Sequence, residues 1–359
     1  MTAMWSFSVG SLWGIPIRIH VTFPLILVWA AFEWGRGRGW QEAAFGVVLA
    51  LLLFLCVLLH EMGHSLVARR FHIRVDEILL LPFGGLARLR TPLDSPWQEL
   101  VVAAAGPLVN VVLGVALYPL YRATASPLVE VMGFSYALNG VGLGPLVAYL
   151  FAANLILAAF NLLPAFPMDG GRMVRAVLAS VLPYRKATVL AVRGGQAMAV
   201  LFGGIALLGQ PLLALVALFI LVAANAEIER VALRDRLRGL LVADFMQRKG
   251  RALSVHQRVA VARLLAALHA QYVWPVVERG HLVGLVTRRS LERSKPAARV
   301  GDVMDRNYPV FHPHMTLYEA QTLLLHEGRE AGAVVENGTL VGLLSAHAFR
   351  QAQRNAESP

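Results

Sequence analysis

Three ionisable side chains with the spacing of a metal site stand at the end of a long apolar segment. In LLLFLCVLLHEMGHSLVARRF, which runs from Leu51 to Phe71, His60 and His64 are four residues apart and Glu61 follows the first of them. On a helix, this spacing puts both imidazoles on one face, where they could bind one zinc ion. Glu61 would then be close enough to act as general base toward water that the metal activates. The segment predicts a hydrolytic centre with one Zn²⁺ per chain.

A hydrolytic zinc site needs a third protein ligand and one open position. Asp169, in FNLLPAFPMDGGR, is the best candidate, because it is acidic and follows an apolar segment. Asp76, Glu77 and Asp94 are alternatives, but they lie in polar sequence where a carboxylate needs no special reason. Each ionised residue near the centre of a membrane span costs about 2.5–3.5 kcal/mol on insertion scales. Because of that cost, we interpret the two histidines, Glu61 and Asp169 as functional residues.

The elements that must position these groups are membrane helices. Hydrophobic residues make up 57% of the 359 residues, charged residues only 15%, and the mean hydropathy is +0.58. Apolar segments fill residues 20–226, and the chain from about 229 onward is polar enough to be soluble. The only cysteine, Cys56, excludes an internal disulfide and a cysteine-based zinc site. We see no removable signal peptide and no nucleic-acid motif, so we expect no nucleic-acid partner despite the net charge of +11.

The apolar segments predict about six transmembrane helices. Four lie near residues 20–34, 41–67, 98–119 and 142–163, and two more, within residues 197–224, follow a short helix and meet at Gln210-Pro211. Residues 5–20 alternate loosely and are strand-like or interfacial, whereas residues 73–90 alternate around a Pro-Phe-Gly-Gly turn and predict a β-hairpin. An edge strand of this hairpin could receive an unwound substrate by β-augmentation.

Charge distribution predicts the orientation of these spans. With the N-terminus in the cytoplasm, the outer segments hold only three basic residues, Arg36, Arg38 and Arg122, and the inner segments up to Arg238 hold the other fifteen. By the positive-inside rule, this asymmetry predicts a multi-pass protein of the cell membrane with both termini cytoplasmic. It also places HEMGH and PMDGG at the cytoplasmic side of the bilayer.

At this point the chain resembles the site-2 proteases, a family of intramembrane zinc metalloproteases. The resemblance covers roughly residues 5–225 and rests on HEMGHSLVAR, AAAGPLVN (Ala103 to Asn110) and NLLPAFPMDGGR (Asn161 to Arg172), in the order of the family. It implies that His60, His64 and Asp169 bind zinc and that Glu61 is the general base. It also implicates Asn110 and Asn161 in holding the substrate or its oxyanion, a role suited to amide donors inside a membrane.

The soluble tail contains an internal repeat. VADFMQRKG matches VGDVMDRNY, and LVGLVTRRSL matches LVGLLSAHAF, both with an offset of 58 residues. Each unit combines a helix with two strands around a turn, and the pair is similar to tandem cystathionine β-synthase (CBS) domains. That resemblance implies an α+β module that regulates, dimerises or senses adenine nucleotides. Thr287 and Ser345 match its nucleotide motif, but Ser290 and Ala348 replace the ribose-binding aspartates, which puts nucleotide binding in doubt.

These expectations combine into one prediction with two alternatives. Residues 1–228 form a membrane-embedded zinc protease domain, 229–240 a helical linker, 241–298 one CBS domain and 299–359 a second. The protein is predicted to be an intramembrane zinc endopeptidase that cleaves the transmembrane or juxtamembrane segment of a single-span membrane protein near the cytoplasmic face. The alternatives are a metal-ion transporter gated by CBS domains and a non-proteolytic relative that binds membrane segments.

Overall fold

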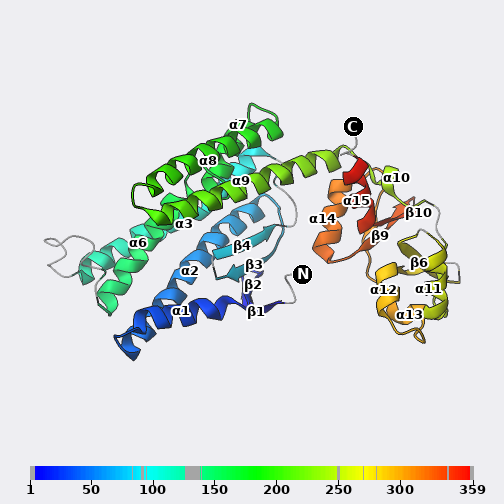
Figure 1. Cartoon of the computed structure of the whole chain (residues 1–359), viewed down its shortest axis with the longest axis horizontal. Coiled ribbons are helices and arrows are strands. Elements are labelled where there is room, and N and C mark those ends of the chain that lie inside the picture. The colour runs from blue at the N-terminus through cyan, green and yellow to red at the C-terminus, as the bar shows by residue number, and fades with distance from the viewer. Residues whose placement is uncertain are drawn as a thin grey trace. The chain divides into compact units, whose positions relative to one another are not determined.

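The chain forms two compact units in the computed structural model, Met1–Glu229 and Arg230–Pro359, which are described separately (Figure 1). The structure describes residues 5–82, 84–89, 93, 95–125, 138, 140–248, 251–269, 271–279, 281–337 and 339–355. Asp94, one of the alternative metal ligands predicted above, lies outside the described residues.

Unit 1 consists mainly of apolar helices. Their bounds are α1 Phe23–Gly35, α2 Trp40–Arg70, α3 Pro96–Thr124, α6 Leu143–Asn161, α7 Asp169–Ala179, α8 Tyr184–Ala206 and α9 Pro211–Arg238. Four of them, α2, α3, α6 and α8, are long and apolar enough to cross a membrane. The predicted count of six is therefore not reached by this measure: α1 has only 13 residues, and α9 is not among the four.

One of the predicted boundaries differs from the structure. The fifth apolar helix, α8, begins at Tyr184 instead of near residue 197, so its first turns include Arg185, Lys186 and Arg193. Residues 229–238 of the predicted helical linker are helical, and they continue α9, which runs from Pro211 to Arg238. Long basic side chains in the first turns of a helix can extend toward water. Basic residues in the sequence therefore did not show where α8 begins.

A four-stranded sheet covers one end of α2. It contains β1 Ser6–Leu12, β2 Ile15–His20, β3 Val75–Leu81 and β4 Gly84–Leu89, in the order β1-β2-β3-β4. β3 and β4 form the predicted hairpin, and β2 joins β3 in parallel. Ile15, Ile78 and Leu80 pack with Phe23 of α1 and Met62 of α2, so the sheet is anchored to the helix that carries the two histidines. This order leaves β4 at an edge of the sheet.

Small residues bring α2 and α3 into close contact. A Cβ on Gly63 of α2 would lie 2.9 Å from the carbonyl oxygen of Ala105, and one on Gly106 of α3 would lie 2.2 Å from His64 Nε2. Neither space admits a methyl group. The AAAGP sequence thus sets the distance between the histidine helix and its neighbour.

A buried ion cluster ties three helices of unit 1 together. Arg175 of α7 is 5% exposed and its guanidinium donates to the carboxylates of Glu99 on α3 and Glu227 on α9. It also lies 4.9 Å from the ring centroid of Phe166 and 5.1 Å from that of Tyr184. Removing one partner would leave a buried charge uncompensated, so this cluster fixes α7, whose first residue is Asp169.

Unit 2 contains two similar three-stranded sheets, β5-β6-β7 and β8-β9-β10. The strands are β5 Leu253–Ser254, β6 Val273–Glu278, β7 His281–Thr287, β8 Val310–Phe311, β9 Ala331–Glu336 and β10 Thr339–Ser345. In each sheet the first strand is parallel to the second, which pairs antiparallel with the third, and a register shift falls at equivalent residues.

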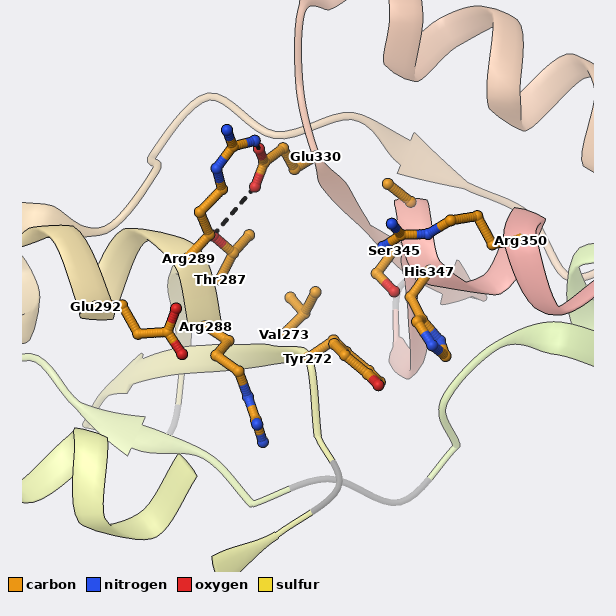
Figure 2. A pocket seen from close by; sticks show the side chains of 11 residues that line it. Tyr272, Val273, Thr287, Arg288, Arg289, Glu292, Glu330, Ser345, His347 and Arg350 are labelled. Atoms are coloured by element: carbon orange, nitrogen blue, oxygen red, sulfur yellow. Dashed lines mark hydrogen bonds and ion pairs between the residues drawn. The ribbon is translucent and has the colours of Figure 1, made fainter. Parts of the chain in front are cut away.

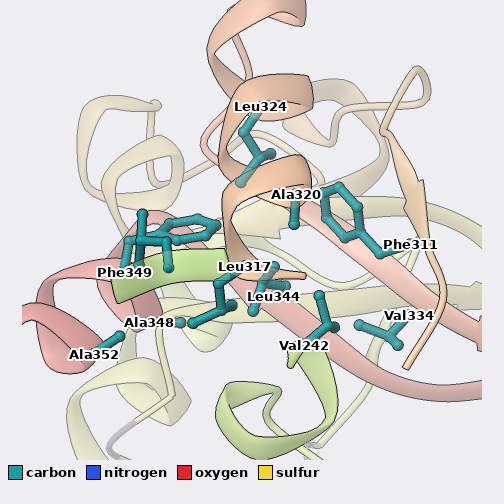
Figure 3. Packing of buried hydrophobic residues seen from close by; sticks show 11 residues of the cluster. Val242, Phe311, Leu317, Ala320, Leu324, Val334, Leu344, Ala348, Phe349 and Ala352 are labelled. Atoms are coloured by element: carbon teal, nitrogen blue, oxygen red, sulfur yellow. The ribbon is translucent and has the colours of Figure 1, made fainter. Parts of the chain in front are cut away.

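The helices of unit 2 also follow the repeat. They are α10 Val242–Phe245, α11 Val259–Leu268, α12 Arg288–Arg293, α13 Val300–Val303, α14 Leu317–Glu327 and α15 Ala346–Asn355. In the second repeat, Phe311, Leu324 and Phe349 pack in one apolar core with Val242 of α10 (Figure 3). An equivalent core around Trp274, 1% exposed, stabilises the first repeat.

Candidate metal centre

Three potential metal ligands converge where α2 meets α7. Asp169 Oδ2 lies 3.3 Å from His60 Nε2 and 3.1 Å from His64 Nε2, and the two imidazole nitrogens are 3.1 Å apart. The helical spacing of four residues brings the histidines together, and α7 begins at Asp169, which delivers the carboxylate to the same point. All three side chains are buried, each residue being 7% exposed.

The outer nitrogen of each imidazole has a fixed partner. His60 Nδ1 lies 2.5 Å from Asn110 Oδ1, and His64 Nδ1 lies 2.7 Å from the carbonyl oxygen of Val102. Both partners are acceptors, so each Nδ1 carries the proton and each Nε2 keeps its lone pair. The two lone pairs face Asp169. Metal-binding histidines commonly have this arrangement.

Asn110, predicted to hold the substrate or its oxyanion, contacts one of the candidate metal ligands. It is fully buried, its Oδ1 contacts His60, and its Nδ2 donates to Asn154 Oδ1 at 2.9 Å. Asn154 in turn donates to the carbonyl oxygen of Leu150 at 2.8 Å. Both ends of the Asn110 amide are therefore engaged inside the protein. Asn154 is not among the predicted site residues, and its only signal in the sequence is a polar side chain within an apolar segment.

Glu61 lies beside the three ligands and lines the same cavity. Its Oε2 accepts a hydrogen bond of 3.1 Å from the backbone N–H of Ala87 on β4. The cavity holds about 270 Å³ and is also lined by Leu86, Ala87 and Leu89. The edge strand β4, the carboxylate of Glu61 and the three candidate metal ligands thus border one cavity.

Asn161 and Arg172 line this cavity as well. The amide of Asn161 donates to the carbonyl oxygen of Leu157 at 3.0 Å, one turn earlier in α6. Arg172 Nη1 lies 3.7 Å from Asp169 Oδ1, the oxygen that does not face the histidines. The structure therefore puts Asn161, but not Asn110, on the wall of the cavity.

Two glycines after Asp169 allow the connection between α6 and α7 to close tightly. A Cβ on Gly170 would lie 2.3 Å from the carbonyl oxygen of Leu163, and one on Gly171 would lie 2.7 Å from Ala165 C. Any larger residue would push the start of α7 away from the loop before it. The PMDGG sequence thus positions the carboxylate of Asp169.

The donor set fits zinc. Two imidazole nitrogens and a carboxylate oxygen are the ligands of many catalytic zinc sites, and the described residues bring together one such group. Glu77, predicted as an alternative ligand, instead pairs with Arg88 at 2.8 Å and Arg18 at 3.6 Å. Asp76 is not part of the group either.

Unit 2 contains a second cavity of about 520 Å³, at the junction of its two repeats (Figure 2). Thr287 and Ser345, the nucleotide candidates, both line it. The hydroxyl of Thr287 accepts from the backbone N–H of Ser290 and so caps α12. The hydroxyl of Ser290 donates to the carbonyl oxygen of Val303, so it is engaged where the nucleotide motif would have a carboxylate.

Similarity to known proteins extends over the whole chain. Residues 48–202 match the model of peptidase family M50, and residues 300–355 match that of the CBS domain. A zinc metalloprotease of Methanocaldococcus jannaschii is 32% identical over 95% of this chain and 94% of its own length. Stage IV sporulation protein FB of Bacillus subtilis is 29% identical over 46% of this chain and 54% of its own. Among solved structures, a site-2 protease from M. jannaschii is 36% identical, with a TM-score of 0.46 over 62% of this chain and 95% of that one.

Proposed function

The chain belongs to peptidase family M50, the site-2 protease family, and from this membership we propose that it is an intramembrane zinc endopeptidase. Its substrate would be the transmembrane or juxtamembrane segment of a single-span membrane protein, cut near the cytoplasmic face. The observation that carries the proposal is the convergence of His60, His64 and Asp169 on one point, with Glu61 in the same cavity. A binding protein without catalysis would need no general base there.

Each side chain then has a defined task. His60, His64 and Asp169 would hold one zinc ion, and their buried partners keep the imidazoles oriented toward it. The ion held by these residues would supply Lewis-acid chemistry, which polarises a carbonyl and activates water at neutral pH. Glu61 accepts the proton of the attacking water and passes it to the leaving amide nitrogen. Asn161, on the cavity wall, is the better placed of the two asparagines to donate to the oxyanion.

The membrane arrangement that we propose has six crossings with both termini in the cytoplasm. Four helices meet the length and polarity of a span, and α1 and α9 would supply the other two. The basic residues support this orientation, since only Arg36, Arg38 and Arg122 would face outward. The metal centre would then open toward the cytoplasmic side.

For unit 2 we propose a regulatory role. The CBS domain of residues 300–355 and the equivalent strand order of the preceding repeat support a tandem module, which could also join two copies of the chain. The cavity with Thr287 and Ser345 is its candidate ligand site. Without an aspartate at position 290 or 348, the ribose of an adenine nucleotide would lack its usual acceptor, so binding there would be weak.

The two alternatives are a CBS-gated metal transporter and a non-proteolytic relative. A transporter would need metal sites along a pathway, whereas the described residues bring together one ligand group. A non-proteolytic relative would be expected to lack a ligand or Glu61, and all four residues are present here.

Glu61→Gln tests the proposal against both alternatives. Purified wild type and variant would be incubated with a panel of single-span proteins, with mass analysis of the products and measurement of bound zinc. We expect the variant to keep zinc but to lose at least about 10²-fold in cleavage rate. Glu42→Gln, at the start of the same helix, is the matched control and should retain activity. Cleavage retained by Glu61→Gln would refute the assigned mechanism, and zinc transport into vesicles would support the transporter.

A further inference from the structure

The two repeats of unit 2 differ sharply in charge. Residues 241–298 contain ten basic and three acidic residues, whereas residues 299–359 contain five basic and seven acidic residues. The repeats share their strand order and register, so the fold does not require this difference. A basic surface on one repeat alone suggests an anionic partner for that repeat.

The basic repeat also carries an exposed apolar stripe on α11. Val261, Leu264 and Leu268 are 47%, 67% and 78% exposed, and their spacing places them along one side of the helix. The opposite side, with Val259, Ala262 and Ala266, is buried in the core. The stripe is therefore not needed to hold α11 in place.

The second repeat has polar residues at the equivalent positions of α14. With the offset of 58 residues, Val261, Leu264 and Leu268 correspond to Glu319, Thr322 and His326. The first repeat thus combines the apolar stripe with a net positive charge. The second repeat has polar residues at the positions of the stripe and no net positive charge. We call this combined surface of the first repeat the α11 surface.

The first repeat exposes basic side chains at the ends of α11 and α12. Arg258 is exposed directly before α11. The guanidinium of Arg263, on a different side of α11 from the stripe, donates to the carbonyl oxygens of Leu291 and Glu292, 2.9 Å each, which holds the end of α12 against α11. Arg293 and Lys295, at that end of α12, are also exposed.

We propose that the α11 surface docks onto the anionic lipid headgroups of the membrane. An exposed apolar stripe on a domain with a net positive charge has the chemistry of an interfacial membrane contact. The chain also joins unit 2 directly to the apolar helices of unit 1, because the single helix α9 runs from Pro211 to Arg238. The inference rests on membrane location only and does not require proteolysis.

A second copy of the chain fits this surface less well. Two α11 surfaces face to face would bring two strongly basic repeats together, which like charges oppose. Two copies arranged head to tail would place the stripe against Glu319 and Thr322 of the other repeat, where apolar burial is lost. Anionic lipid matches both the charge and the apolar side chains.

The test uses the full chain in nanodiscs with a fluorophore that reports polarity. Cys56→Ser removes the only native thiol. Ala267→Cys, exposed next to the stripe, carries the fluorophore. Leu325→Cys, at the equivalent position of the second repeat, is the control. We expect a blue shift at position 267 in discs with phosphatidylserine and a smaller one with phosphatidylcholine alone. At position 325 we expect no dependence on lipid charge. High salt, with a Debye length of about 3 Å at 1 M, should remove most of the difference between the two lipids.

A swap between repeats completes the test. Val261→Glu, Leu264→Thr and Leu268→His give α11 the residues of α14 and should abolish the shift at position 267, with thermal unfolding unchanged because these side chains are exposed. A shift that is equal in neutral and anionic discs would overturn the proposal. So would a shift that appears in detergent and grows with protein concentration, since it would identify a second copy as the partner.

Discussion

At the scale of single residues, the structure separates two asparagines that the sequence treats alike. Asn110 contacts a metal-binding candidate, whereas Asn161 faces the cavity. We predict that Asn110→Leu weakens zinc binding about 10- to 100-fold, because His60 loses the acceptor that fixes its ring. Asn161→Ala should keep zinc and reduce cleavage. Competition with a chelator measures the zinc affinity, and turnover at saturating zinc measures the cleavage rate. Equal zinc affinity in the two variants would contradict the different roles assigned to Asn110 and Asn161.

The candidate metal ligands could be predicted from the sequence, but the residues that orient them could not. His60 and His64 follow from helical spacing, and Asp169 follows from the need for a third ligand that is acidic and lies after an apolar segment. The partners of Asn110 depend on how α3 and α6 are rotated about their axes, which hydropathy does not encode. Asn154 therefore looked like any polar residue in an apolar helix, although its amide completes the contacts of Asn110.

At the scale of elements, the α2–α3 distance controls the metal centre through Gly106. A Cβ at this position would lie 2.2 Å from His64 Nε2 and 2.7 Å from His60 Cε1. We predict that Gly106→Ala displaces the imidazoles and lowers both zinc content and cleavage by at least about tenfold, a loss typical of disturbed ligand geometry. Gly114→Ala is the control on the same helix, since its Cβ meets only the flexible end of Leu155 at 3.1 Å. Metal analysis of the purified variants checks this, and full zinc content in Gly106→Ala would contradict it.

The open edge of β4 gives a second prediction about elements. Because β4 is an outer strand and Ala87 already donates to Glu61, an extended substrate that pairs with β4 would pass the catalytic group. In a Cys56→Ser background, Leu86→Cys, exposed and on the cavity wall, should form a disulfide with a cysteine near the scissile bond of a bound substrate. Leu25→Cys, exposed on α1, is the control. Equal crosslinking at both positions would exclude substrate pairing with β4.

The hairpin was predictable because its side chains alternate around a tight turn, and the structure contains it. Its place in a larger sheet was not, since β2 and β3 are 54 residues apart and pair in parallel. The start of α8 was also missed, because three basic residues in its first turns resembled loop sequence. Contacts between distant segments decided both features.

At the scale of the whole molecule, the change from apolar to polar sequence predicts two units, but the boundary between them lies within one helix, α9. Its apolar first half and charged second half predict a span followed by a helical linker, and in the structure both parts belong to one helix from Pro211 to Arg238. Helical hydrogen bonds do not depend on side-chain polarity, so a helix can continue from an apolar to a polar environment. Whether α9 crosses the membrane is therefore the remaining question of the topology.

Accessibility of single cysteines answers this question. With six crossings, Leu208 between α8 and α9 lies outside the cell, and Ser180 before α8 and Arg236 near the end of α9 lie inside; all three are exposed in the structure. In a Cys56→Ser background, we predict that an impermeant maleimide added to intact cells labels Leu208→Cys alone. Ser180→Cys and Arg236→Cys should react only after permeabilisation. If Leu208→Cys also required permeabilisation, α8 and α9 would enter and leave the membrane on the same side, and the proposed six crossings would be reduced to four.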